Sequence, residues 1–193
     1  MRSAKVLRLG AFGFMALFGL VGTLFVAGYA FEDPGGTAAV VMTAAWVVPM
    51  AALSVYALLR PDSAAPVLTV VTALVLVSVV ADALLGIVPR DDWGPVGAIT
   101  VFSLGVSLAF LGLHRPSLAG LLMVAAALTQ LVGTVLGFMV RGGDGGPGAG
   151  AMLGGSSGVV VLPLLLAGAA FWVAGRLAQE PVGPVGHQPQ HAH

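Results

Sequence analysis

Six long apolar runs restrict the fold of this chain more than any other feature of its sequence. Five of them contain no Asp, Glu, Lys or Arg, and the third contains only Asp82. A helix rises 1.5 Å per residue, so about 20 residues cross a hydrocarbon core of about 30 Å. Because lipid offers no partners to backbone amides, each run is predicted to be a transmembrane helix. The predicted spans are residues 9–31, 37–59, 66–88, 96–113, 117–140 and 158–175.

The composition favours the same class of protein. Of the 193 residues, 58% are hydrophobic and 8% are charged, more apolar surface than a soluble fold of this size can bury. Eight basic residues balance eight acidic ones, which argues against a nucleic-acid partner. The absence of cysteine excludes disulfides, thiolate metal sites and thiol redox chemistry. We therefore predict an all-α, polytopic membrane bundle of six helices in contact with the lipid bilayer.

The two ends of the chain are predicted to differ. The basic start MRSAKVLRLG and the apolar run behind it resemble a signal peptide, but that run is longer than the usual 7–15 residues, so it is expected to stay as the first span. The membrane domain is expected to occupy residues 1–178, followed by a disordered cytoplasmic tail, 179–193. Three tail histidines, His187, His191 and His193, suit a divalent metal, although a terminal, Pro-containing tail more often binds nothing. No cofactor is predicted.

Orientation follows from the positions of the basic residues between the spans. Six of them fall on one side: Arg2, Lys5, Arg8, Arg60, Arg115 and Arg176. Arg90 and Arg141 fall on the other. This distribution predicts that both termini lie in the cytoplasm, and the preference for Arg over Lys suggests a bacterial plasma membrane.

The chain also contains an internal repeat. GYAFEDPGG, GIVPRDDWGP and GFMVRGGDGGP each end a span with Gly and pass through a charged turn, at Gly28, Gly86 and Gly137. On the opposite side, LLRPDSAAP matches LHRPSLAG. The pattern predicts three helical hairpins in tandem. A bundle with approximate threefold character and an irregular six-helix bundle fit this pattern equally well.

Asp82 is the candidate for function inside the membrane. It lies eight residues before Arg90, about 12 Å along a helix axis, and Ser78 precedes it by one turn on the same face. An ionisable group at that depth is expected to be protonated or paired, and it marks a functional site by default. The alternative is a hydrogen-bonded clip between neighbouring helices.

A second polar pair lies in the fifth span. Gln130 is followed one turn later by Thr134, beside a small-residue pair formed by Gly133 and Gly137. Such pairs let two helices approach closely, so this face is expected to serve helix packing more than chemistry.

Charged residues gather at the predicted outer mouth. They are Glu32, Asp33, Arg90, Asp91, Asp92 and Arg141. A ring of this kind could attract cations or bind a metal loosely. The simpler interpretation is a set of solvated loop charges. The Gly-rich loop of residues 141–158 lacks the Gly-Lys-Ser/Thr ending of a phosphate loop, so nucleotide binding is not expected.

Four stretches carry a resemblance: GYAFEDPGG, GPVGAITVF, LHRPSLAGLL and LGGSSGVVVLPLLLAG. On these the chain resembles a group of small multi-pass bacterial membrane proteins to which no activity is assigned. The resemblance implies a membrane bundle and no catalytic residues.

Two functions remain open at this point. The first is a structural or accessory bundle that binds lipid, another membrane protein or a second copy of itself. The alternative is a small proton- or cation-coupled transporter or channel that uses Asp82. No nucleophile, base or closed set of metal ligands indicates an enzyme.

Overall fold

The structure, a computed structural model, describes residues 2–32, 35–87, 96–141 and 156–179. These residues form six helices and no strand: α1 Arg2–Glu32, α2 Gly36–Leu59, α3 Pro61–Leu85, α5 Val96–Gly112, α6 Pro116–Arg141 and α8 Ser156–Gln179. Each predicted span coincides with one helix, which confirms the all-helical class. Three helices differ noticeably from their predicted bounds. The helix α1 includes the basic segment before residue 9, α3 begins and ends earlier than 66–88, and α8 continues past residue 175 to Gln179.

Local signals explain where these helices begin and end. Gly35, the N-cap of α2, and Gly36, its first residue, adopt positive φ angles of 69° and 58°, a conformation that residues with a Cβ avoid. The helix α3 begins with Pro61 in its first turn, where the missing N–H would have no helical partner. It ends at Gly86, whose left-handed conformation (φ 66°, ψ 43°) caps the last turn.

Two Arg-Pro corners join helices at one end of the bundle. At both Arg60 and Arg115, the arginine N–H donates to the carbonyl four residues earlier, and the arginine carbonyl accepts from the N–H four residues later. These four bonds measure 2.8 to 3.1 Å. The matching motifs LLRPDSAAP and LHRPSLAG therefore fold into equivalent corners, so the sequence repeat has a local structural counterpart.

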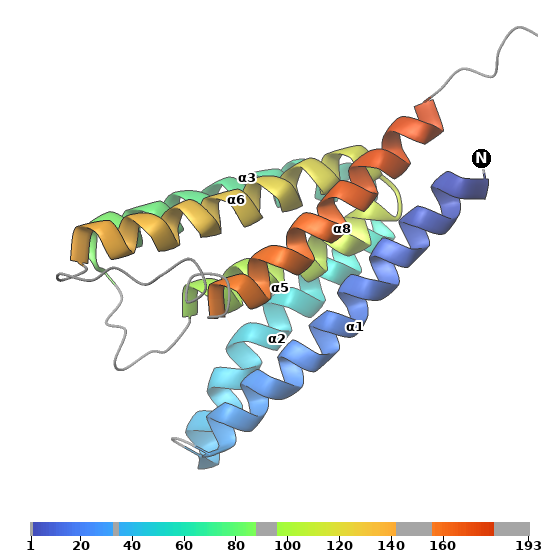
Figure 1. Cartoon of the computed structure of the whole chain (residues 1–193). Helices are drawn as coiled ribbons and strands as arrows, with labels where there is room; N and C mark the ends of the chain where they lie inside the picture. Colours follow the sequence, from blue (N-terminus) through green and yellow to red (C-terminus); the bar gives the residue numbers. More distant parts are fainter. Residues whose placement is uncertain (1, 33–34, 88–95, 142–155, 180–193) are drawn as a thin grey trace, which may run out of the picture.

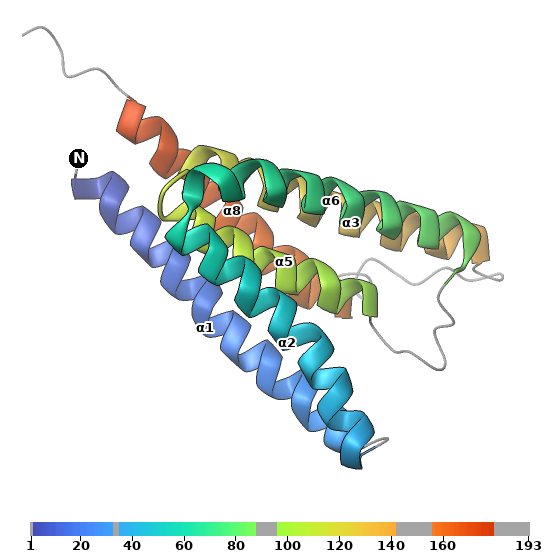
Figure 2. The same ribbon diagram turned by 180° about the vertical axis from the view of Figure 1, so that it is seen from behind.

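The bundle is irregular, with α5 at its centre. The helix α5 packs against all five other helices, whereas α3 packs more extensively with α6 than with α5, its expected hairpin partner. In both views α1 lies beside α2 and α3 beside α6, and these two pairs diverge from the end where α1 begins (Figures 1 and 2). Of the two arrangements that fit the repeat, the irregular six-helix bundle is the one observed.

The helix α2 buries small side chains and exposes many large apolar ones, unlike a helix of a soluble protein. The buried side chains of α2 are the small ones, Ala39, Ser54 and Ala57. Seven of its large apolar side chains are exposed: Val40, Val41, Met42, Val48, Val55, Leu58 and Leu59. A soluble monomer rarely exposes so extended an apolar surface. Lipid therefore fits as the solvent of this helix.

Five helices are long and apolar enough to cross a membrane. They are α1, α2, α3, α6 and α8, which contain candidate spans of 22 to 25 residues. The helix α5 has 17 residues and is a shorter apolar helix than these five. The predicted fourth span is thus an apolar helix that is enclosed by its neighbours, with a core around Leu108, Leu111 and Val101.

Glycines let the central and C-terminal helices approach closely. A Cβ atom on Gly120 of α6 would lie 2.5 Å from the Gly168 carbonyl oxygen and 2.6 Å from the Trp172 nitrogen of α8. On α1, a Cβ atom on Gly19 would lie 2.7 Å from a methyl group of Val106. Close backbone contact through small residues is typical of membrane helices.

Candidate functional site: polar residues of the bundle

Asp82 lies in the last turn of α3. The Gly86 N–H donates to the Asp82 carbonyl oxygen at 2.9 Å, and this bond closes the helix. The predicted depth of about 12 Å below Arg90 assumed a helix that continued to residue 88, and that assumption is wrong, because left-handed Gly86 ends the helix at Leu85. Asp82 is therefore close to a helix end. Its side chain is half-buried and takes part in a polar or electrostatic interaction.

Ser78 does not join Asp82 in a polar site. Its hydroxyl donates to the Val75 carbonyl of its own helix at 2.8 Å, and the residue is exposed. The proton of Ser78 is therefore used within α3. Ser78 and Asp82 share one face of α3, as their one-turn spacing predicts, but the Ser78 hydroxyl does not donate to Asp82.

The fifth-span pair lies on α6, the helix that packs beside α3. The Thr134 hydroxyl donates to the Gln130 backbone carbonyl at 2.9 Å. Gln130 is 8% exposed, and its buried Oε1 accepts no hydrogen bond within the described part of the chain. At Gly133 the two helices approach closely: a Cβ there would lie 2.8 Å from a methyl group of Val79 and 4.0 Å from the Ala83 Cβ.

The four predicted polar residues lie on α3 and α6. These two helices contact each other at Gly133, Val79 and Ala83. The close approach expected of Gly133 is observed. Asp82 directly precedes Ala83 in sequence, and Gln130 precedes Gly133 by three residues. Close contact through a small residue is typical of packed membrane helices.

A buried hydroxyl cluster between α2 and α5 was not anticipated from the sequence. The Ser54 hydroxyl donates to the Ser107 hydroxyl at 3.4 Å. Ser107 in turn lies 3.2 Å from the Met50 carbonyl and 3.4 Å from the Ser103 carbonyl, so its single proton has two acceptors. Both serines are at most 5% exposed. This cluster is an interhelical polar clip one turn after Pro49.

A small cavity lies between α1, α2 and α5. Its walls include Thr23, Trp46, Met50, Phe102 and Ser103, and its volume is about 20 Å³. That volume holds about one water molecule. Asp82 is not among the residues that line it, so this cavity offers no route to the predicted carboxylate.

The charged residues of the predicted outer mouth lie largely outside the described residues. Glu32 is exposed at the end of α1. Asp33, Arg90, Asp91 and Asp92 lie outside the described residues, as does the side chain of Arg141, the last residue of α6. The tail histidines His187, His191 and His193 lie outside them as well. The proposed ring and the tail metal site therefore stay predictions.

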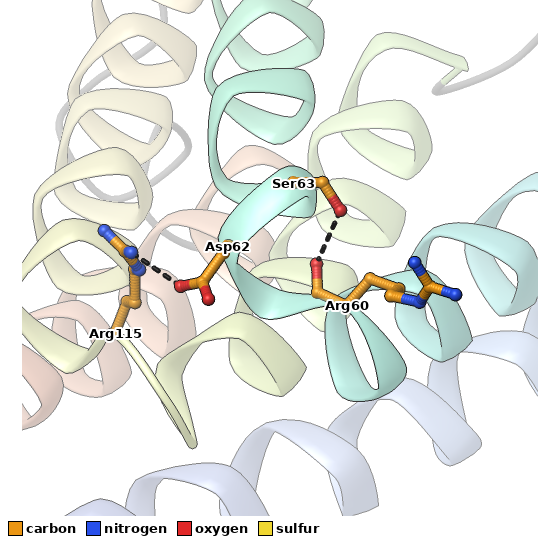
Figure 3. Close-up of polar contacts among 4 residues, drawn as sticks. All are labelled: Arg60, Asp62, Ser63 and Arg115. Carbon is orange, nitrogen blue, oxygen red and sulfur yellow. Dashed lines mark hydrogen bonds and ion pairs between the residues drawn. The ribbon is translucent and has the colours of Figure 1, made fainter.

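The two Arg-Pro corners are linked by an ion pair. Arg115 Nη2 lies 2.7 Å from Asp62 Oδ1, which joins the α5–α6 corner to the first turn of α3 (Figure 3). Ser63 donates to the Arg60 carbonyl at 3.3 Å, and the Arg60 guanidinium extends away from this pair. Both partners of the ion pair are well exposed, at 49% and 88%. Such a pair orients two corners and contributes little stability.

The described residues contain no group of three or more His, Asp or Glu side chains placed to hold a metal ion. Comparison with protein-family models, curated proteins and solved structures found no match. The function must therefore be argued from the packing and the charge distribution of the chain itself.

Proposed function

We propose that this chain is a structural or accessory protein of the bacterial plasma membrane, whose bundle binds lipid or another membrane subunit and does not move a solute. The observation that carries the proposal is the packing around α5. Ten of its last twelve residues are buried, and its neighbours contribute Met15, Leu68, Leu164 and Phe171 to the same apolar core. A transport path needs polar groups and space along the bundle axis.

The polar content of the interior supports a packed bundle. The buried polar residues in the described part of the chain are Ser54, Thr72, Ser107 and Gln130, and no charged residue is buried there. Thr72 bonds its own helix at the Leu68 carbonyl, 2.6 Å away. The serines form a clip. The two serines hold α2 and α5 together, as hydroxyl groups commonly do between membrane helices.

The orientation belongs to the same proposal. The corners with Arg60 and Arg115 lie at the end where α1 begins and α8 ends, which we call the basic end (Figure 1). Under the positive-inside rule this end faces the cytoplasm, with both termini inside. The chain contains no cysteine, so single cysteines can report its topology without background.

Two measurements test the proposal. Ser63→Cys at the basic end should react with a membrane-impermeant maleimide only after the cells are permeabilised. Thr37→Cys, exposed near the start of α2, should react in intact cells. The opposite labelling pattern would contradict the orientation.

The activity arm uses sealed proteoliposomes with a pH-sensitive or cation-sensitive dye. The intact protein should give no flux above that of protein-free vesicles under a proton or cation gradient. Flux that disappears in Asp82→Asn would contradict the accessory role and establish the transporter alternative. Helix content of the variant, measured by circular dichroism, controls for misfolding.

A further inference from the structure

Four basic residues lie in the helix segments at the end of the bundle where α1 begins and α8 ends. Arg2, Lys5 and Arg8 lie in the first two turns of α1, and Arg176 lies in the last turn of α8. The two helices run in opposite directions and pack against each other, so these ends lie together in both views (Figures 1 and 2). The arrangement gathers positive charge from two separate helices.

No acid of the described residues balances this charge. Glu32 and Asp82 lie toward the far ends of α1 and α3, and Asp62 is paired with Arg115. The Nε–H of Arg8 is buried and donates to no acceptor within the described part of the chain. A buried donor without an acceptor is costly, so an anion that reached Arg8 would gain a bond the bundle itself does not make.

Arg176 adds a second guanidinium in a membrane-interface setting. Its Cζ lies 4.9 Å from the ring centroid of Trp172, one turn earlier on α8. Exposed apolar side chains border the same ends: Val6 and Leu9 on α1, and Val173 on α8. Tryptophan prefers the level of the lipid headgroups, and guanidinium groups bind phosphate oxygens in a fork. The same site therefore offers cations for a headgroup and apolar surface for acyl chains.

We propose that these ends of α1 and α8 bind the phosphate of an anionic glycerophospholipid of the cytoplasmic leaflet. Arg8 and Arg176 contact the phosphate, Lys5 and Arg2 add to the local positive potential, and the acyl chains lie along Leu9 and Val173. The exposed apolar border favours a lipid over a free phosphate ion. The inference rests on the membrane placement proposed above and adds a binding site to it.

The test uses Trp172 as the reporter. With Trp46→Phe and Trp93→Phe as background, Trp172 is the single tryptophan. Its fluorescence is measured in phosphatidylcholine vesicles that contain a minor fraction of brominated phosphatidylglycerol, or of brominated phosphatidylcholine. The anionic lipid should quench Trp172 more strongly, with a relative binding constant at least about fivefold higher, the effect of one cation near an anionic surface.

Variants that remove individual charges distinguish a specific lipid site from general attraction of anionic lipid to the basic end. Arg8→Gln combined with Arg176→Gln should bring the lipid preference close to one. Arg60→Gln, which makes the same kind of charge change elsewhere on the basic end, should leave it nearly unchanged. If the double variant loses helix content, the exposed Arg176→Gln alone should still lower the preference by a measurable fraction.

Three results would overturn the inference. They are equal quenching by both brominated lipids in the parent protein, an equal loss of preference in Arg60→Gln, or displacement of the lipid by inorganic phosphate. The last result would indicate an ion site. The cysteine-labelling experiment is independent of these readings, so failure of the lipid site is distinguishable from failure of the membrane orientation.

Discussion

Replacing Gly120 with alanine tests whether backbone contact between α6 and α8 holds the bundle together. The new Cβ would lie 2.5 Å from the Gly168 oxygen and 2.6 Å from the Trp172 nitrogen, and ordinary contact begins at 3.4 Å. Both neighbours are backbone atoms and cannot rotate away. The helices must therefore separate by about 0.9 Å at this point. A gap of that size forfeits roughly a quarter to a half of the local dispersion energy.

We expect Gly120→Ala to lower the free energy of unfolding by about 1–3 kcal/mol, the usual cost of overpacking. Gly168→Ala should cost less, because its Cβ meets a movable Val124 methyl at 2.9 Å and the Gly120 oxygen at 3.0 Å. Gly10→Ala is the matched control, since no atom lies within 4 Å of its Cβ position. That variant should be neutral or gain up to about 1 kcal/mol from helix propensity.

The measurement is equilibrium unfolding by sodium dodecyl sulfate in mixed micelles, followed by far-UV circular dichroism and tryptophan emission. The order of stability should be Gly10→Ala, then Gly168→Ala, then Gly120→Ala. If Gly120→Ala were as stable as Gly10→Ala, the close contact of α6 and α8 would not exist as described. A change only in emission, without a shifted midpoint, would also refute the energetic argument.

Three further predictions use the same unfolding assay. Ser107→Ala should lower stability by about 1 kcal/mol, because it removes the hydroxyl that joins α5 to α2; a variant as stable as the parent would show that the clip contributes nothing. Gln130→Leu should raise stability by about 1 kcal/mol, because no donor in the described part of the chain reaches the buried Oε1; a loss would reveal a partner for Gln130. Asp62→Asn should change stability by less than about 1 kcal/mol, since its ion pair with Arg115 is exposed, and a larger loss would mean that the pair holds the two corners together.

The sequence predicted the helices well because a long apolar run without charged residues is enough to identify a membrane helix. It misplaced the start of α1, since Arg2, Lys5 and Arg8 are excluded by an apolar criterion although Arg and Lys are good helix formers. The end of α3 was signalled by Gly86, but hydropathy alone carried the prediction three residues past the observed helix end at Leu85, to residue 88. The error mattered, because the distance of about 12 Å between Asp82 and Arg90 assumed that the helix continued to residue 88.

Packing was much harder to predict. Lipid-facing and protein-facing helices are equally apolar, so hydropathy cannot distinguish the exposed α2 from the enclosed α5. The Ser54–Ser107 clip was missed for a related reason. A hydroxyl in an apolar helix can bond its own backbone, as Thr72 does, and the sequence does not show which hydroxyls will cross to a neighbour.

The short length of α5 is consistent with its place in the bundle. Its 17 residues extend about 25 Å, less than the roughly 30 Å of a hydrocarbon core. A lipid-facing helix of that length would thin the bilayer or tilt its neighbours. Enclosed by five longer helices, α5 need not match the bilayer. Its packing covers part of α1, α2 and α3, and the large apolar side chains of these helices that stay exposed form the surface available to lipid.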